Sequence, residues 1–252
     1  MSSRPTTAVI IPARYASTRF PAKALAVLAG KPMIQHTWEQ AMRSKADKVL
    51  VATDHESIIQ AVENFGGTAV MTREDHISGT DRIYEASQSA DCDIIINVQG
   101  DEPLIPPEII DTLIDLMVTH PECEMATVAV PASREILEDP NKVKVVMAND
   151  GYALYFSRAG IPFLRSGGSA AGALLHWGIY AFRRESLAKF VQYPPSSLEN
   201  CEKLEQLRAL ENGMRIQVVV SNLESVGVDT PEDLEQAEKL IAERLQNNGV
   251  AK

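Results

Sequence analysis

The 252-residue sequence predicts an α/β fold with a mostly parallel central sheet and an antiparallel extension. Over the first 130 residues, short apolar segments alternate with segments of helical periodicity, which is the pattern of a doubly wound parallel sheet. After Val130, strand-like segments follow one another around Asn149-Asp150-Gly151, which is typical of an antiparallel hairpin. No Pro/Ser/Gly-rich linker divides the chain, so we expect a single domain over residues 1–252.

Each predicted strand of the parallel part is a short, mostly apolar run. These strands are Ala8–Ile11, Val49–Ala52, Ala69–Met71, Ile94–Val98 and Ala126–Val130. The intervening segments predict helices at Pro32–Arg43, Glu56–Phe65, Asp81–Ser89 and Pro107–Val118. The last of these helices begins at a proline, which the first turn tolerates because an N–H at that position has no helical partner.

The antiparallel part contains a hairpin and one longer strand. Val143–Met147 and Tyr152–Phe156 flank the Asn-Asp-Gly turn. Alternation within Leu174–Phe182 predicts that His176 and Tyr180 share one face of a strand. The opposite face is predicted to lie in the core and to carry Leu175, Trp177, Ile179 and Ala181.

Composition excludes several classes of protein. The net charge is −10 and the pI is near 5.0, which disfavours nucleic acid or an anionic membrane as the main partner. The sequence has neither a run of about 18 apolar residues nor a basic-then-apolar amino terminus, so we expect no spanning helix and no secretory signal. Three scattered cysteines argue against a disulfide framework or a zinc site and fit a reducing cytoplasm.

The first predicted strand leads directly into a basic loop that carries Arg14, Arg19 and Lys23. Residues 1–38 contain five Lys or Arg and no Asp or Glu, although the whole chain is acidic. Parallel sheets bind ligands at the carboxyl ends of their strands, so this loop is predicted to hold an anion such as a triphosphate. The alternative is that these cations are solvated loop charges.

Two carboxylates are candidates for a metal site. Asp101 follows a predicted central strand and Gly100, and Asp101 with Glu102 supplies the hard oxygen ligands that Mg²⁺ prefers. An ordinary Gly-Asp turn is the alternative at this position. Asp229 precedes Thr230-Pro-Glu-Asp233, which resembles a capping box that opens a helix. Here the alternative is that Asp229 itself caps that helix.

Two further segments allow both a structural and a functional interpretation. Ser78-Gly-Thr80 enters a predicted helix, where its backbone N–H groups either bind an anion or a base edge or form a plain N-cap. Glu205 and Gln206 lie in a helix predicted over residues 202–213, whose buried stripe consists of Leu204, Leu207 and Leu210. On such a helix Glu205 points away from the stripe, so a solvated glutamate is the default interpretation.

Motifs along most of the chain resemble the CMP-Kdo synthetases, which transfer CMP from CTP to the acid sugar 3-deoxy-manno-octulosonate (Kdo). The amino-terminal Ile-Pro-Ala-Arg-Tyr-Ala-Ser-Thr-Arg-x-Pro-x-Lys is the most specific match. The other matches are Val51-Ala-Thr-Asp54, Met71-Thr72, Ser78-Gly-Thr80 with Arg82, Asn97-Val-Gln-Gly-Asp-Glu-Pro103, Ala153-Leu-Tyr-Phe-Ser-Arg158, His176-x-Gly-Ile-Tyr180, Leu204-Glu-Gln-Leu-Arg208 and Val228-Asp-Thr-Pro-Glu-Asp233.

The resemblance implies a Rossmann-like nucleotide-diphospho-sugar transferase fold, the enzymatic activity of that family, and its place in lipopolysaccharide biosynthesis. It implies a nucleotide-binding part over about residues 1–130, a sugar-binding and dimerisation part over about 131–229, and a carboxyl-terminal helix over 230–252. Similar proteins are homodimers, so the resemblance also implies a homodimer. Without the resemblance, we would interpret His176 and Tyr180 as a hydrogen-bonded structural pair.

The resemblance also implies a role for each site residue. Arg14, Lys23, Asp101 and Asp229 would be catalytic, and Asp101 and Asp229 would hold Mg²⁺. The implied substrate-binding residues are Arg19, Ser78, Thr80, Arg82, Gln99, Arg158, His176, Tyr180, Glu205 and Gln206. For Arg158 a structural ion pair is the alternative interpretation.

The sequence departs from the family pattern at two places. The usual Pro-Gly-Lys-Pro is Pro21-Ala-Lys-Ala24 here, and because Ala22 resists positive φ, we expect a left-handed turn at this position to be costly for the loop. The Gly-rich stretch 166–173 replaces a more charged segment, which keeps an 8-amino Kdo analogue open as the substrate. A sialic-acid-type sugar is also kept open as the substrate, and a non-catalytic nucleotide-binding module is the interpretation that involves no catalysis.

Overall fold

The computed structural model describes residues 4–16, 20, 22–165, 172–223, 225–228 and 230–249, without the side chains of 244–249. The chain forms two compact units, each assembled from separate segments. The first unit comprises Ala8–Asp91, Asn97–Ile110 and Glu224–Lys252, and the second comprises Met1–Thr7, Cys92–Ile96 and Asp111–Leu223. The single-domain organisation expected from the sequence stays a prediction.

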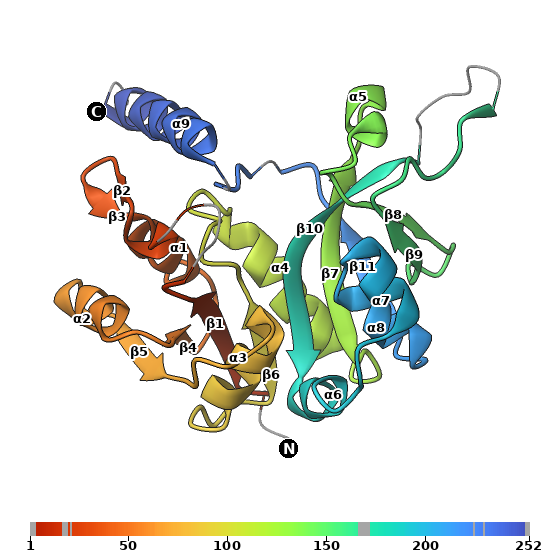
Figure 1. The fold of residues 1–252 in the computed structure, drawn as a ribbon, viewed down its shortest axis with the longest axis horizontal. Coiled ribbons are helices and arrows are strands. Elements are labelled where there is room, and N and C mark those ends of the chain that lie inside the picture. Colours follow the sequence, from red (N-terminus) through yellow and green to blue (C-terminus); the bar gives the residue numbers. More distant parts are fainter. Residues whose placement is uncertain are drawn as a thin grey trace. The chain divides into compact units, whose positions relative to one another are not determined.

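The first unit contains a parallel sheet, as predicted. Its strands are β1 (Thr7–Ala13), β4 (Lys48–Thr53) and β5 (Thr68–Met71), and β4 pairs with both neighbours (Figure 1). The helices that alternate with these strands are α1 (Met33–Ala41), α2 (Glu56–Asn64) and α3 (Gly79–Ser87). From Thr7 to Ile11 every β1 residue is buried, because a parallel strand with both faces covered needs a nearly continuous apolar run.

The first unit also contains a small hairpin that the sequence did not predict. Its strands are β2 (Val27–Leu28) and β3 (Lys31–Pro32), and they follow the short 3-10 helix η1 (Lys23–Leu25). Ala29 and Gly30 both have positive φ, as a two-residue turn of type I′ requires. Two strands of two residues each leave too short a periodic pattern to detect.

The carboxyl-terminal helix α9 (Pro231–Gly249) belongs to the same unit. The predicted capping box is confirmed, since the Thr230 N–H donates to Asp233 and the Asp233 N–H donates to the Thr230 hydroxyl oxygen. Thr230 therefore caps the helix, whereas Asp229, the alternative cap, lies outside the described residues. The helix contributes Ala237 to a buried cluster that also contains Leu28, Met33, Leu104 and Val228.

The second unit contains the antiparallel extension. The strand β7 (Met125–Pro131) pairs antiparallel with β10 (Leu174–Arg183) and parallel with β11 (Ile216–Val220) (Figure 1). The predicted hairpin is confirmed as β8 (Lys144–Met147) and β9 (Ala153–Ser157), and β6 (Ile94–Asn97) lies beside β10. The helices are α4 (Pro107–Thr119), which begins in the first unit, and α5 (Arg134–Glu138), α6 (Arg184–Phe190), α7 (Ser197–Glu202) and α8 (Gln206–Glu211).

The predicted faces of β10 need a correction. A register shift between Trp177 and Tyr180 interrupts the alternation, as a β-bulge does. His176 and Tyr180 share a face, as predicted, and their rings lie 5.5 Å apart. However, His176 is buried, with 8% of its surface exposed, whereas Trp177 is half-buried. The prediction that Trp177 lies in the core opposite an accessible His176 is therefore wrong.

The predicted helix over residues 202–213 is also wrong. It is divided into α7 and α8 because Lys203 adopts a left-handed conformation with φ 55°. The predicted stop is confirmed, since Asn212 caps α8 and Gly213 has positive φ. Gln206 consequently begins a new helix, and Glu205 is its N-cap residue.

Candidate active site

A cavity of about 370 Å³ lies in the first unit where β1 ends. This is the edge at which parallel sheets bind ligands. Several of the residues that line it are predicted site residues. The lining residues are Pro12, Ala13, Arg14, Lys23, Ala24, Met33, His76, Ile77, Ser78, Gly79, Arg82, Gln99, Gly100 and Asp101.

The basic loop contributes two cations to this cavity. Arg14 is exposed, and Lys23 in η1 has a side chain that is 16% exposed. The Lys23 ammonium donates to Asp101 Oδ2 at 2.6 Å and to the Val228 carbonyl oxygen at 3.0 Å. Arg19 lies outside the described residues. Arg14 and Lys23 are thus brought together at one cavity, as predicted.

The loop adopts at Ala22 the turn that the sequence predicts to be costly. Ala22 has φ 53° and ψ 30°, so the loop does make a left-handed turn immediately before Lys23. An L-residue in this conformation is strained by about 1–2 kcal/mol, because its Cβ approaches the following carbonyl oxygen. The chain therefore uses the turn in spite of the residue that occupies it.

We expect Ala22→Gly to raise the free energy of unfolding by about 0.5 kcal/mol or more, because glycine relieves the strain and loses only part of that gain as unfolded-state entropy. Ala26→Gly is the matched control, since Ala26 has φ −56° and gains nothing from glycine. Urea denaturation measures both variants. A loss of stability in Ala22→Gly equal to that in Ala26→Gly would contradict this account.

Asp101 fits a divalent cation. Its carboxylate faces the cavity, is 31% exposed, and already attracts a positive charge in the Lys23 ammonium. Gly100 allows the backbone to lie close to the Pro12 carbonyl oxygen, since a Cβ on residue 100 would meet that oxygen at 2.9 Å. The Asp101 carbonyl oxygen accepts the N–H of Val228 at 2.9 Å. Carboxylate oxygens at this position suit Mg²⁺.

The other predicted ligand, Asp229, lies outside the described residues. Its neighbour in sequence, Val228, contacts both Lys23 and Asp101 through its backbone. Within the part of the chain that the structure describes, no group of three or more His, Cys, Asp or Glu side chains could hold a metal ion. The pair Asp101 and Asp229 as a magnesium site stays a prediction.

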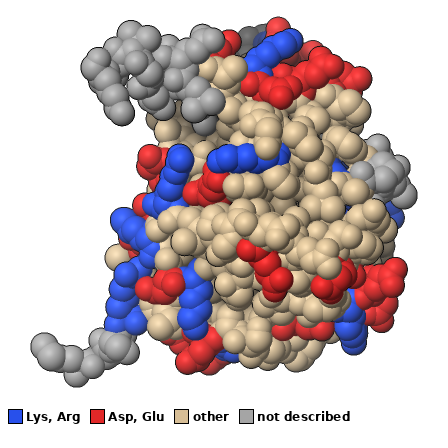
Figure 2. Space-filling view, turned by 90° about the vertical axis from the view of Figure 1, so that its left-hand side faces the viewer, with Lys and Arg blue, Asp and Glu red and all other residues tan. Residues whose placement is uncertain are grey.

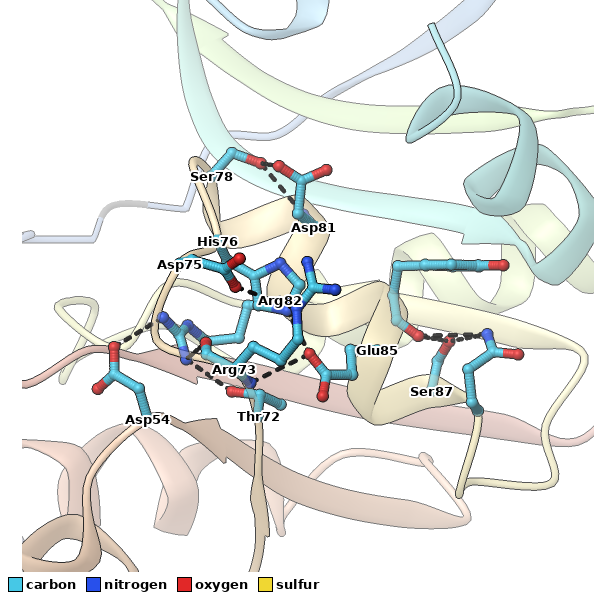
Figure 3. Close-up of polar contacts among 12 residues, drawn as sticks. Asp54, Thr72, Arg73, Asp75, His76, Ser78, Asp81, Arg82, Glu85 and Ser87 are labelled. Carbon is cyan, nitrogen blue, oxygen red and sulfur yellow. Dashed lines mark hydrogen bonds and ion pairs between the residues drawn. The ribbon is translucent and has the colours of Figure 1, made fainter.

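Arg82 is buried in a polar network rather than free to meet an anion (Figure 3). Its Nη2 donates to Asp54 Oδ2 at 2.7 Å, and its Nη1 donates to the Thr72 hydroxyl at 2.6 Å. Arg82 lines the cavity, but Asp54 balances its charge. A direct contact of Arg82 with substrate stays a prediction.

The loop before α3 carries the remaining candidates of this unit. Ser78 is the N-cap, because its hydroxyl oxygen accepts the Asp81 N–H, and Thr80 is buried. His76 pairs with Glu85 (Figure 3). Burial raises the pKa of Glu85, but hydrogen bonds from His76 and the Arg73 N–H outweigh it and lower the pKa. The Gln99 amide donates to Asn97 Oδ1 at 3.2 Å and lines the cavity.

The second unit brings together several of the predicted sugar-binding residues. Burial lowers the pKa of His176 to about 3, so the ring is neutral, and its Nε2 lies 3.0 Å from the Thr127 hydroxyl. Burial and the negative charge of Glu205 raise the pKa of Tyr180 well above its usual value. Gln206 is buried, and its amide nitrogen has no hydrogen-bond partner among the described residues. A buried donor of this kind requires a polar partner, such as water or a ligand.

Arg158 has a structural role in this unit. Its Nε donates to the Glu202 carbonyl oxygen at 2.8 Å, and its backbone N–H donates to Glu202 Oε2 at 2.9 Å. The fully buried Lys144 uses its ammonium group to bind the carbonyl oxygens of Asp139, Lys142 and Arg158. Burial lowers the pKa of Lys144. A contact between Arg158 and a sugar stays a prediction.

Sequence reasoning missed Asp54 and Lys144. Asp54 lies within one of the quoted motifs, Val51-Ala-Thr-Asp54, and directly follows a predicted strand, which was a usable signal. Lys144 lies in a strand whose pattern gave no sign that a lysine would be fully buried, because buried lysines are rare.

Comparison with known proteins defines the class. The sequence profile of the family described as cytidylyltransferase matches residues 8–216. A solved structure of CMP:2-keto-3-deoxy-manno-octonic acid synthetase complexed with CTP is 44% identical, with a TM-score of 0.91, over 95% of this chain and 99% of that one. The fold is that of a nucleotidyltransferase.

Curated relatives narrow this class. A 3-deoxy-manno-octulosonate cytidylyltransferase of Pelobacter propionicus is 52% identical over 90% of this chain and 94% of its own length. Another, of Geobacter sulfurreducens, is 51% identical over 92% of this chain and 98% of its own length. The chain belongs to the 3-deoxy-manno-octulosonate cytidylyltransferase family and is an enzyme.

On the face drawn in Figure 2, Lys and Arg side chains lie among Asp and Glu side chains. None of the helices in the described part of the chain combines the length and the apolar character that crossing a membrane requires.

Proposed function

We propose that the chain transfers CMP from CTP to the anomeric hydroxyl of Kdo and releases pyrophosphate, as a step of lipopolysaccharide biosynthesis. Membership of the family and the 44% identical protein complexed with CTP support this function. The observation that carries it is that Arg14, Lys23 and Asp101 all line one cavity at the carboxyl end of β1.

The residues of the first unit perform the phosphate chemistry. Arg14 and Lys23 bind the triphosphate and stabilise the negative charge that moves onto the departing pyrophosphate. Asp101 and Asp229 would hold Mg²⁺, which would lower the pKa of the attacking hydroxyl and screen the phosphate charge. No protein nucleophile is required. We propose that Ser78, Thr80, Arg82 and Arg19 bind the nucleotide and that Gln99 binds the acid sugar.

The residues of the second unit bind the acid sugar. The buried Gln206 amide donates to a sugar oxygen, which supplies the partner that its nitrogen otherwise lacks. Tyr180 and Glu205 are close enough to influence each other electrostatically, and both are proposed to bind sugar hydroxyls. Arg158 and the neutral His176 complete the proposed set.

The assembly and the compartment are also proposals. Leu154 and Phe163, from the antiparallel extension, are 62% and 86% exposed, which supports a homodimer formed through this region. Cys92, Cys123 and Cys201 are free thiols, which supports a reducing cytoplasm.

Lys23→Met tests the phosphate role of the basic loop. We expect it to raise the KM for CTP about tenfold or more, because a charge-assisted hydrogen bond is lost, while the KM for Kdo stays nearly constant. Lys31→Met is the matched control, since Lys31 pairs with Glu39 instead of lining the cavity. Steady-state pyrophosphate release measures both constants. Equal rises in the two KM values, or an equal effect of Lys31→Met, would contradict this role.

A further inference from the structure

Asp54 connects three segments around the cavity of the first unit. It follows the last residue of β4 and is nearly buried, with a side chain that is 7% exposed. Its Oδ2 accepts Arg82 Nη2 at 2.7 Å, and its Oδ1 accepts the backbone N–H of Tyr15 at 3.0 Å. Both carboxylate oxygens are therefore engaged, one by α3 and the other by the basic loop.

Tyr15 is the residue at which the basic loop closes. Its N–H donates to Asp54, and its carbonyl oxygen accepts the Ala22 N–H at 3.1 Å. Its ring stacks on His55, with 3.8 Å between the ring centroids. The two cations flank this closure, because Arg14 precedes Tyr15 and Lys23 follows Ala22. Each cation is thus one residue away from a fixed backbone group.

Arg82 fixes the carboxylate in turn. Its side chain is 3% exposed, and its guanidinium also binds the Thr72 hydroxyl and the Arg73 carbonyl oxygen (Figure 3). A guanidinium with this many partners holds one orientation, and the planar fork orients the carboxylate that it binds. Arg82 thereby acts on the cavity through Asp54 as well as by lining it.

We infer that Asp54 is a positioning residue for the triphosphate of CTP: it binds no substrate, but it holds the Tyr15 N–H and so fixes the spacing between Arg14 and Lys23. This inference rests on the proposed function of the cavity. Misplacing charged groups at a reacting centre by about 1 Å lowers rates by as much as a hundredfold, so a fixed spacing has a measurable effect.

Asp54→Asn is the first test. Asparagine keeps an oxygen for the Tyr15 N–H, but it carries no charge to balance Arg82 and presents an amide donor to a guanidinium donor. We expect the KM for CTP to rise on the order of tenfold, with the KM for Kdo unchanged. Asp54→Ala removes both acceptors, and we expect a larger rise.

Glu199→Gln is the matched control. Glu199 and Arg208 form an ion pair of similar burial in the second unit, with Arg208 Nη2 at 2.5 Å from Glu199 Oε1. We expect this variant to lose a comparable amount of thermal stability while the KM for CTP stays constant. A purely structural role for Asp54 would instead give Asp54→Asn the same behaviour as Glu199→Gln, and that result would overturn the inference.

A second variant covers the case in which Asp54 substitutions fail to fold. Tyr15 is 38% exposed, so Tyr15→Ala removes the stacking on His55 with little loss of packing. We expect this variant to fold and to raise the KM for CTP severalfold, because without the stacked ring the N–H of residue 15 is held less firmly against Asp54. An unchanged KM would overturn the inference that the position of this N–H sets the spacing of Arg14 and Lys23. Turnover by the wild type, measured in the same assay, tests the proposed function separately.

Discussion

The Asp101→Asn variant is expected to release pyrophosphate from CTP at least about a hundredfold more slowly than the wild type, because it removes a charge at the reacting centre. The fold should persist, since asparagine has nearly the same volume and its amide oxygen still accepts a hydrogen bond from Lys23. Initial rates of pyrophosphate release over a range of Mg²⁺ concentrations measure the effect. Asp229→Asn is expected to behave in the same way.

The control for this prediction is an exposed carboxylate of the same unit. Asp91 is exposed and does not line the cavity, so Asp91→Asn should leave the rate unchanged. Near-normal turnover of Asp101→Asn at limiting Mg²⁺ would remove Asp101 from the proposed metal site.

The second large effect is expected at His176, as a change in stability. His176 is buried, its ring lies 4.9 Å from that of Phe156 at a steep angle, and its Nε2 contacts the Thr127 hydroxyl. His176→Ala therefore opens a cavity, and we expect the free energy of unfolding to fall by about 2 kcal/mol or more. The β10 faces predicted from the sequence implied that His176→Ala would hardly change the stability. The burial of His176 in the structure reverses that expectation.

His176 also makes stability depend on pH. Burial lowers its pKa to about 3 in the folded chain, whereas an unfolded histidine titrates near 6.5. Between pH 3 and pH 6.5, His176 binds a proton in the unfolded chain but not in the folded chain, so acid favours unfolding. The contribution of His176 to stability is therefore complete above pH 6.5 and is lost as the pH falls toward 3. The slope is at most about 1.4 kcal/mol per pH unit.

His176→Gln should remove this contribution. Denaturation of both proteins at several pH values gives the difference in slope, and His120→Gln is the control because His120 is exposed. Parallel pH dependence of the wild type and His176→Gln would show that His176 is not a buried neutral histidine.

The parallel part of the fold could be predicted because its strands are short, apolar and separated by helical periodicity. All five predicted strands and all four predicted helices of the first 130 residues are present, with shifts of one or two residues at their ends. The capping box of α9 and the Asn-Asp-Gly hairpin were equally local signals. These features depend on residues that are close together in the chain, so they can be recognised from the sequence alone.

The errors arose where tertiary structure overrides local pattern. The bulge in β10 ended the alternation on which the burial of Trp177 was predicted. The left-handed Lys203 and Ala22 adopt a conformation that their side chains disfavour. Neither residue type predicts this conformation, because the surrounding structure supplies the energy that holds a non-glycine residue there.

In the candidate site, too, the sequence predicted the positions of some residues, whereas only the structure shows certain contacts. Arg14, Lys23 and Asp101 could be placed at one edge of the sheet because each lies in a segment that follows a predicted strand, and all three line the cavity. The Asp54–Arg82 pair joins residues that are 28 positions apart, and no periodicity relates them. The sequence alone therefore could not show that Arg82 is paired with Asp54.

Pyrophosphate release from CTP by the purified wild type tests the central claim most directly. The account predicts release that requires both Mg²⁺ and Kdo, is abolished by a chelator, and is slower with an 8-amino Kdo analogue or a sialic acid. Release that is independent of the acid sugar, faster with the 8-amino analogue or a sialic acid, or undetectable with all of these sugars would contradict it.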